Sequence, residues 1–178
     1  RHENRQGNYI YNQFNARVVN REQPNLGDPD GWGIAQLDRS RQEGVDTTTA
    51  EVWNWKTNLV SMAALLVEKR NMHLGFISLF RAKYGTHTNW VEPPSSYEFI
   101  PGSNIRLAAD EWAEIVLYNG AGGVPWTTLV INNSTNRFRS PWVFLPNETN
   151  VNRRWTFHDN GTNYAQRISF EIQRGVTN

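Results

Sequence analysis

Apolar side chains recur at helical spacing in the middle of the chain. Between residues 47 and 72 they return every three or four positions, which places them on one face of an α-helix. The members of this face are Val52, Trp55, Leu59, Met62, Leu65 and Leu66. Thr48 and Glu51 have the spacing of a capping box, in which each side chain bonds the other residue's backbone N–H. The pattern predicts a helix over residues 47–72.

Three further segments show a helical pattern. Residues 75–85 form a short apolar stretch closed by a glycine, and residues 104–118 return to the helical period. Residues 163–175 present apolar side chains at helical spacing near the end of the chain. We expect a helix in each segment.

The segment 127–160 has a different pattern. The runs TTLVIN, PWVFLP and RRWTFH are short and β-like, and Asn-rich turns separate them. Residues 31–38 favour a turn and a short edge strand. The predicted fold class is mainly α with a small β insertion around residues 127–160. With 178 residues and no internal repeat, residues 1–178 are interpreted as a single domain.

Composition removes several classes of function. The chain has no Cys, which excludes disulfides, a thiolate nucleophile and zinc–thiolate sites. A net charge of +1 gives no global field for nucleic acid or an anionic membrane, and no apolar run reaches the roughly 20 residues of a membrane span. The four His lack ligand spacing, so neither a metal nor a cofactor is expected. The eight Trp suit a core or a carbohydrate groove, and we expect Trp53, Trp55 and Trp112, at helical spacing, in the core.

Three short motifs occur in a fixed order. Glu3 lies in RHENRQG, Gly31–Asp38 read GWGIAQLD, and Leu117–Gly123 read LYNGAGG. Their order resembles goose-type lysozymes and the related lytic transglycosylases, which carry a Glu-Ser pair, then G-x-G-[LI]-[MA]-Q, then A-Y-N-A-G-x-G. The resemblance covers about residues 1–66 and 105–123 and the final predicted helix.

The chain departs from the family pattern at four points. Asn4 replaces the Ser that follows the acid, Ala35 replaces a Met, and Gly120 stands where Ala is common. None of these changes removes a group that transfers a proton. Glu3 is the third residue, whereas the family's acid follows a helix. We therefore expect that helix upstream, in a longer protein of which this domain is the C-terminal part.

The resemblance implies a lysozyme-like fold that cleaves the β-1,4 bond between N-acetylmuramic acid and N-acetylglucosamine in peptidoglycan. Such cleavage at neutral pH needs a protonated carboxyl group beside the glycosidic oxygen. The family pattern implies that Glu3 is this general acid. It also implies that Asp38, with Asp28 or Asp30, holds the attacking water. Lytic transglycosylases lack the water-holding Asp, and the sugar's own 6-hydroxyl closes a 1,6-anhydro ring instead.

Four other residues are expected to bind the substrate. Trp32 is the candidate sugar platform, and Gln36 is placed to hydrogen-bond an N-acetyl group. By the same resemblance, Tyr118 and Asn119 close the site near the acid.

Each of these residues also has a structural interpretation. Glu3 is then a solvated acid near the chain start, and Asp28 and Asp30 belong to an ordinary turn. Asp38 pairs with a neighbouring arginine, and Asn119 caps a helix.

The sequence thus favours a monomeric muramidase whose partner is the peptidoglycan glycan strand. It resembles the C-terminal lysozyme domain of a type VI secretion effector, or a phage lysin, acting in the periplasm or cell wall of a target bacterium. An immunity protein that blocks the groove would be its second partner. The alternatives are a lytic transglycosylase and a non-catalytic module that binds peptidoglycan or chitin.

Overall fold

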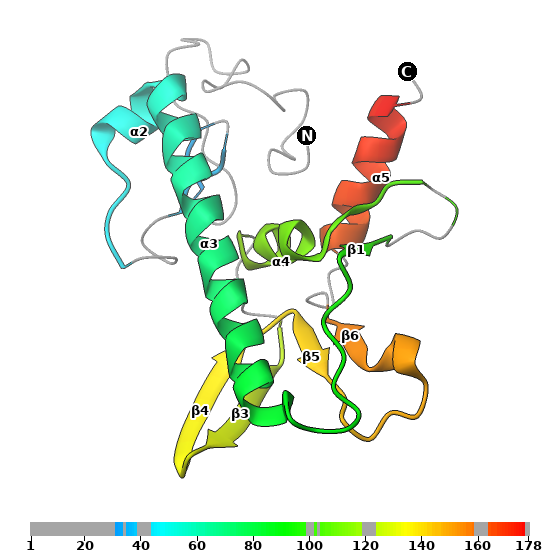
Figure 1. Ribbon diagram of the computed structural model, residues 1–178. Helices are drawn as coiled ribbons and strands as arrows, with labels where there is room; N and C mark the ends of the chain where they lie inside the picture. The colour runs from blue at the N-terminus through cyan, green and yellow to red at the C-terminus, as the bar shows by residue number, and fades with distance from the viewer. Residues whose placement is uncertain are drawn as a thin grey trace. The chain divides into compact units, whose positions relative to one another are not determined.

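The computed structural model describes residues 31–33, 35–38, 44–98, 102, 104–118, 124–158 and 164–176 (Figure 1). The helices are α2 (Thr49–Trp53), α3 (Trp55–Tyr84), α4 (Ala109–Tyr118) and α5 (Tyr164–Val176), with a 3-10 turn at Val151–Arg153. The strands are β1 (Ser96–Tyr97), β2 (Leu107–Ala108), β3 (Trp126–Ile131), β4 (Ser134–Arg139), β5 (Trp142–Phe144) and β6 (Trp155–Phe157). The chain divides into two compact units, Arg1–Leu65 and Leu66–Asn178. The interpretation of residues 1–178 as one domain stays a prediction.

The mainly α fold class is wrong. Helices make up 46% and strands 20% of the part of the chain that is described, and the strands form small antiparallel sheets. Their order is β1–β2, β3–β4 and β5–β6, each pair two-stranded. The β segments also supply much of the buried core of the second unit: Leu129, Phe138, Trp142, Phe144 and Trp155. The strands within residues 127–158 are therefore part of the packed core of the second unit.

The first helical segment begins as expected but divides at Asn54. The capping box of Thr48 and Glu51 is confirmed. Asn54 has an extended backbone (φ −117°, ψ 111°), which ends α2. Its Oδ1 then accepts from the backbone N–H of Lys56 at 3.0 Å and of Thr57 at 3.4 Å. A single Asn thus ends α2 and caps the first turn of α3.

Helix α3 is continuous where the sequence pattern predicts two helices. It runs through Gly75, the residue at which the second helix was expected to begin. Gly75 is exposed, and a side chain built there meets nothing within 4 Å. The glycine costs the helix about 1 kcal/mol in propensity, which packing elsewhere along α3 offsets.

Buried tryptophans organise the second unit. Trp112 and Trp142 are completely buried, and each indole N–H donates to a backbone carbonyl: Trp112 to Tyr97 at 2.8 Å, and Trp142 to Ala109 at 3.1 Å. These bonds satisfy the only polar atom of each side chain, so burial carries no unpaired donor. The expectation of a core position is confirmed for Trp112. It is wrong for Trp53 and Trp55, which are 51% and 50% exposed.

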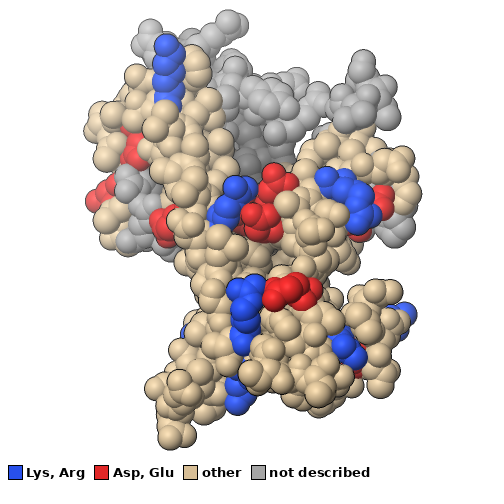
Figure 2. All heavy atoms as spheres, viewed as in Figure 1, with Lys and Arg blue, Asp and Glu red and all other residues tan. Residues whose placement is uncertain are grey.

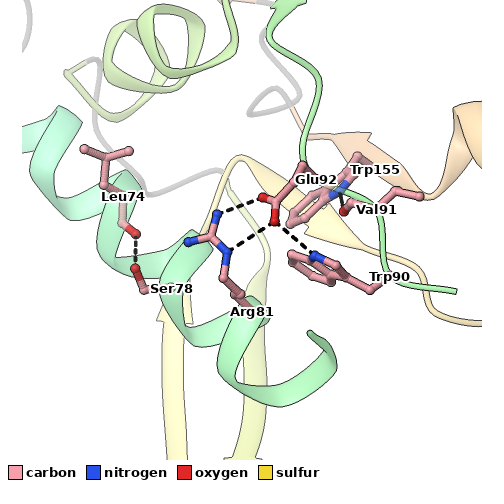
Figure 3. Close-up of polar contacts among 7 residues, drawn as sticks. All are labelled: Leu74, Ser78, Arg81, Trp90, Val91, Glu92 and Trp155. Atoms are coloured by element: carbon pink, nitrogen blue, oxygen red, sulfur yellow. Dashed lines mark hydrogen bonds and ion pairs between the residues drawn. The ribbon is translucent and has the colours of Figure 1, made fainter. Parts of the chain in front are cut away.

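The segment after α3 is held against the end of that helix (Figure 3). Arg81 pairs with Glu92 through Nη2–Oε2 at 2.8 Å, and Trp90 Nε1 donates to Glu92 Oε1 at 3.2 Å. The hydrogen bond from Arg81 is the main cause that lowers the pKa of Glu92. Beside this contact, Trp155 Nε1 donates to the carbonyl of Val91 at 2.9 Å. The exposed ion pair stabilises little by itself, and the bond from Trp155 to Val91 also joins this segment to β6.

Surface charges of opposite sign lie together. In Figure 2, acidic and basic side chains on the visible face are mostly neighbours, and neither sign gathers into a broad patch. This agrees with a net charge of +1. No helix in the described residues is both long enough and apolar enough to cross a membrane.

His73 is a buried titratable side chain on α3. It is 3% exposed, and burial lowers its pKa from 6.5 to about 4, with the negative charge of Asp110 opposing the shift. A lowered pKa means that the unfolded chain binds the proton more tightly than the folded one. The stability that neutral His73 contributes is therefore complete above pH 6.5 and is lost as the pH falls through about 4.

We therefore predict acid-dependent destabilisation that His73→Leu reduces. The free energy of unfolding, measured by urea titration, should fall by up to about 3 kcal/mol between neutral pH and pH 4. The leucine variant should lose this component, because it has no proton to bind. His87→Leu is the control, since His87 is exposed. An unchanged pH dependence in His73→Leu would contradict the assignment.

Candidate functional site

The sequence GWGIAQL folds into a closed turn, called here the glycine turn (Gly31–Leu37, of which Ile34 lies outside the described residues). Trp32 N donates to the carbonyl of Leu37 at 2.9 Å, and Leu37 N donates back to the carbonyl of Trp32 at 3.0 Å. This reciprocal pair is the narrow antiparallel bridge of a hairpin. The four residues between the two partners form its loop.

The two glycines are required for different reasons. A Cβ on Gly31 would lie 2.8 Å from the backbone oxygen of Gln36 and 2.9 Å from its Cβ, closer than real side chains approach. Gly33 has a φ of 73°, in the left-handed region that a residue with a side chain adopts at a cost. One glycine therefore permits close packing and the other permits the turn.

Gln36 occupies the left-handed region although it is not glycine, with a φ of 54°. Such a conformation costs on the order of 1–3 kcal/mol and persists only where the surroundings enforce it. Gln36 N donates to the carbonyl of Gly33 at 3.3 Å, and its side-chain Nε2 donates to the same oxygen at 2.7 Å. The Gly33 carbonyl thus holds the Gln36 side-chain carboxamide in place.

Asn58, in the first turn of α3, hydrogen-bonds the backbone of the glycine turn. It is fully buried, and its Oδ1 accepts from the backbone N–H of Ala35 at 2.9 Å. Its Nδ2 donates to the carbonyl of Trp32 and to the carbonyl of Glu51, each at 3.0 Å. One carboxamide therefore joins the turn to the last part of α2 and to α3.

The Glu51 side chain extends this polar network. It is 4% exposed, and its Oε2 accepts from the backbone N–H of Thr48 at 2.7 Å and from the Thr48 hydroxyl at 2.8 Å. Its Oε1 accepts from the hydroxyl of Ser61 at 2.6 Å. Several hydrogen-bond donors stabilise the charged form of a buried carboxylate.

Three of the predicted site residues lie on or next to the glycine turn. Trp32, Gln36 and Asp38 are all partly buried, and Asp38 follows directly after Leu37, which is completely buried. Tyr118 is also buried, but it ends α4 in the second unit. Glu3, Asp28, Asp30 and Asn119 lie outside the described residues.

A second cluster of ionisable groups joins α3 to α4 in the second unit. Arg70 Nε lies 2.7 Å from Glu114 Oε2 and 3.5 Å from Asp110 Oδ2. The hydrogen bond to Glu114 raises the pKa of Arg70. Burial raises the pKa of Glu114 and outweighs the opposing effect of Arg70. A raised carboxyl pKa suits a general acid, but the direct bond to Arg70 occupies this carboxylate, so we assign the cluster to helix packing.

Asn58, which hydrogen-bonds the glycine turn, is the residue near the candidate site that the sequence analysis missed. The sequence feature that could have indicated its role is an asparagine that follows Lys56 and Thr57 near the start of a helix and precedes mostly apolar residues. Within the described residues, no group of three or more His, Asp or Glu side chains is arranged to hold a metal ion.

Removal of the Asn58 carboxamide should destabilise the chain strongly. Asn58→Ala leaves the buried N–H of Ala35 without this partner, which costs about 1–3 kcal/mol. It also removes one hydrogen bond each from the carbonyls of Trp32 and Glu51, although the Trp32 carbonyl keeps its bond from Leu37. We expect the free energy of unfolding to fall by about 3 kcal/mol in a urea titration. Asn71→Ala is the matched control on the same helix, because Asn71 is exposed. Equal effects of the two substitutions would refute the anchoring role.

Comparisons with known proteins returned no match to a protein-family model, to a curated protein or to a solved structure. The function of the glycine turn is therefore argued from its sequence and its geometry.

Proposed function

We propose that this chain is a muramidase, which hydrolyses the β-1,4 bond between N-acetylmuramic acid and N-acetylglucosamine in peptidoglycan. One observation carries the proposal. The motif GWGIAQLD, which resembles the goose-type signature, folds as a strained and internally bonded turn that ends at a partly buried aspartate. Backbone strain that the surroundings enforce is a common feature of catalytic sites.

The glycine turn has the rigidity that a catalytic carboxylate needs. Leu37 is completely buried, and both its backbone N–H and its carbonyl are hydrogen-bonded to Trp32. The backbone position of the next residue is therefore held in place. Asp38 is that residue. Rate enhancement by positioning depends on holding a group within a fraction of an ångström, which an anchored turn does better than a free loop.

In this proposal the chemistry uses one carboxyl group as the acid and a second position, filled by aspartate, to hold the water. The Glu3 carboxyl gives its proton to the glycosidic oxygen as the bond from that oxygen to C1 breaks. The Asp38 carboxylate, with Asp28 or Asp30, takes a proton from water as the water oxygen bonds to C1 from the opposite face. The product then has inverted configuration and a free reducing end.

Two residues of the turn would bind the sugar. Trp32 is partly buried, so part of its indole is accessible for stacking on a saccharide ring. The Gln36 carboxamide is held by its bond to Gly33, and its Oε1 would accept from an N-acetyl N–H. We include Tyr118 and Asn119 as residues that close the site. The domain would act in the periplasm or cell wall of a target bacterium, with an immunity protein as its inhibitor.

The first experiment identifies the products. Purified peptidoglycan is digested with the chain, and the fragments are resolved by mass spectrometry before and after borohydride reduction. We expect N-acetylmuramic acid ends that borohydride reduces, because water is the acceptor. Non-reducible 1,6-anhydro ends, lighter by one water, would replace the muramidase with a lytic transglycosylase.

The second experiment tests the acid and the water-holding carboxylate. Glu3→Gln and Asp38→Asn should each lower the rate of sacculus lysis by about 10²-fold or more, because each removes a proton-transfer group. Both variants should still sediment with purified sacculi. Asp46→Asn is the control, since Asp46 is exposed and lies outside the turn. Full lysis by Glu3→Gln would remove Glu3 from the role of acid.

A further inference from the structure

The glycine turn is hydrogen-bonded in two ways. Its internal bonds close the bridge between Trp32 and Leu37 and hold the side chain of Gln36. Asn58 supplies bonds of the other kind, which join the turn to α3. Its Oδ1 accepts from the backbone N–H of Ala35 at 2.9 Å, and its Nδ2 donates to the carbonyl of Trp32 at 3.0 Å. One side chain of α3 thus holds the backbone of the turn at two points.

These two points belong to the part of the turn that the proposed function assigns to the sugar. Trp32 is itself the sugar platform, and Ala35 directly precedes Gln36. Asp38 is attached differently, because it follows Leu37, whose backbone is held by the bridge within the turn. The two bonds to α3 therefore act on the sugar-binding residues more directly than on the carboxylate that would hold the water.

The turn needs such support because its conformation is strained. Gln36 has a φ of 54° although it is not glycine, and such a backbone persists only where its surroundings enforce it. Only molecules in which the turn has its binding conformation can take the ligand. The apparent affinity therefore falls in proportion to the fraction of such molecules. Any contact that raises this fraction before the ligand arrives strengthens binding.

The Asn58 carboxamide is itself fixed in orientation. It is completely buried, and its Nδ2 also donates to the carbonyl of Glu51 at 3.0 Å. An amide has one acceptor oxygen and one NH₂ group, so a reversal of this side chain would place an oxygen against two carbonyl oxygens. The carboxamide therefore has one orientation in which its bonds to α2 and to the turn form together.

We propose that Asn58 is a positioning residue for the substrate, which holds the glycine turn in its sugar-binding conformation before the glycan arrives. This inference rests on the proposed function, because that function assigns Trp32 and Gln36 to the sugar. Asn58 acts through these two residues and not on the reacting atoms. Its contribution is therefore to the affinity for the glycan, and the rate of bond cleavage in the bound complex does not depend on it.

The test separates KM from kcat. Soluble peptidoglycan glycan strands are digested by the parent chain and by Asn58→Ala, at a temperature where urea titration shows both to be folded. The KM of Asn58→Ala should rise about tenfold, as the fraction of molecules with the binding conformation falls to about a tenth. Its kcat should stay within about twofold of the parent, because saturating substrate draws the whole population into that conformation.

Ser61→Ala is the matched control. The Ser61 hydroxyl donates to Glu51 Oε1 at 2.6 Å, so its loss also weakens the junction of α2 and α3 but removes no bond to the turn described above. Its urea midpoint should fall, while its KM stays within about twofold of the parent. An equal rise of KM in the two variants would overturn the positioning role, as would a fall of kcat in Asn58→Ala at the parental KM.

Amide hydrogen exchange tests the same role without a change at Asn58. In the Glu3→Gln chain, which leaves a short glycan oligosaccharide intact, exchange of the Ala35 N–H is measured with and without that ligand. The N–H should be protected in the free protein, and the ligand should change this protection by no more than about twofold. Protection that is present only with the oligosaccharide would overturn the proposal, because the ligand would then order the turn.

Digestion by the parent chain distinguishes the two proposals. A parent that gives no cleavage products refutes the muramidase, and the positioning role is refuted with it. An active parent whose KM is unchanged by Asn58→Ala refutes the positioning role alone and leaves the muramidase in place.

Discussion

The buried carboxamide of Asn58 is the interaction on which the described part of the first unit depends. It pairs with peptide groups of the glycine turn and of α2, segments that are far apart along the chain. A buried amide that makes all of these bonds costs little, whereas any one of them left unmade costs its full desolvation. The turn, the end of α2 and the start of α3 therefore form together. The strained backbone of Gln36 persists because the surrounding hydrogen bonds enforce this conformation.

The same principle of satisfied burial acts in the second unit through aromatic side chains. Trp112, Trp142 and Trp155 each donate an indole N–H to a backbone carbonyl of a segment distant in sequence. The rings of Trp142 and Trp155 pack edge to face with neighbours, as Trp155 does against Phe80 with centroids 5.5 Å apart. Tryptophan thus supplies both a directed hydrogen bond and a large buried apolar area. This explains how many short strands and loops share a core without a large sheet.

The core also decides what the hairpin of β3 and β4 shows to solvent. A slip of one residue between strand and core would bury Trp126 and expose Leu129, because the side-chain period of a strand is two. The packing of Leu129 and Phe138 prevents such a slip. Which side chains of the hairpin are exposed is therefore a consequence of the packing of its buried face.

Local signals were sufficient for part of this structure. The capping box, the β-like runs TTLVIN, PWVFLP and RRWTFH and the final helix follow from side chains within a few positions of one another, so the sequence predicts them. Strand β4 lies in a stretch that the sequence pattern assigned to an Asn-rich turn, so its prediction was wrong. The glycines of the turn are equally local, because their need arises from φ and from a contact five residues away. For the candidate site, the sequence predicted Trp32, Gln36 and Asp38, which lie on or next to the glycine turn.

Tertiary structure alone decided the rest. Periodicity placed Trp53 and Trp55 in the core, yet both are half exposed, because burial depends on which distant segment covers a helix face. A sequence pattern of short strands does not show whether the strands lie on the surface of a helical core or supply core residues themselves. The mainly α prediction was wrong for this reason. Asn58 looks like any helical asparagine until the turn folds over it. Interactions between residues close in sequence determined where helices and turns begin and end. Packing between distant segments determined which side chains are buried and which backbone groups they hydrogen-bond.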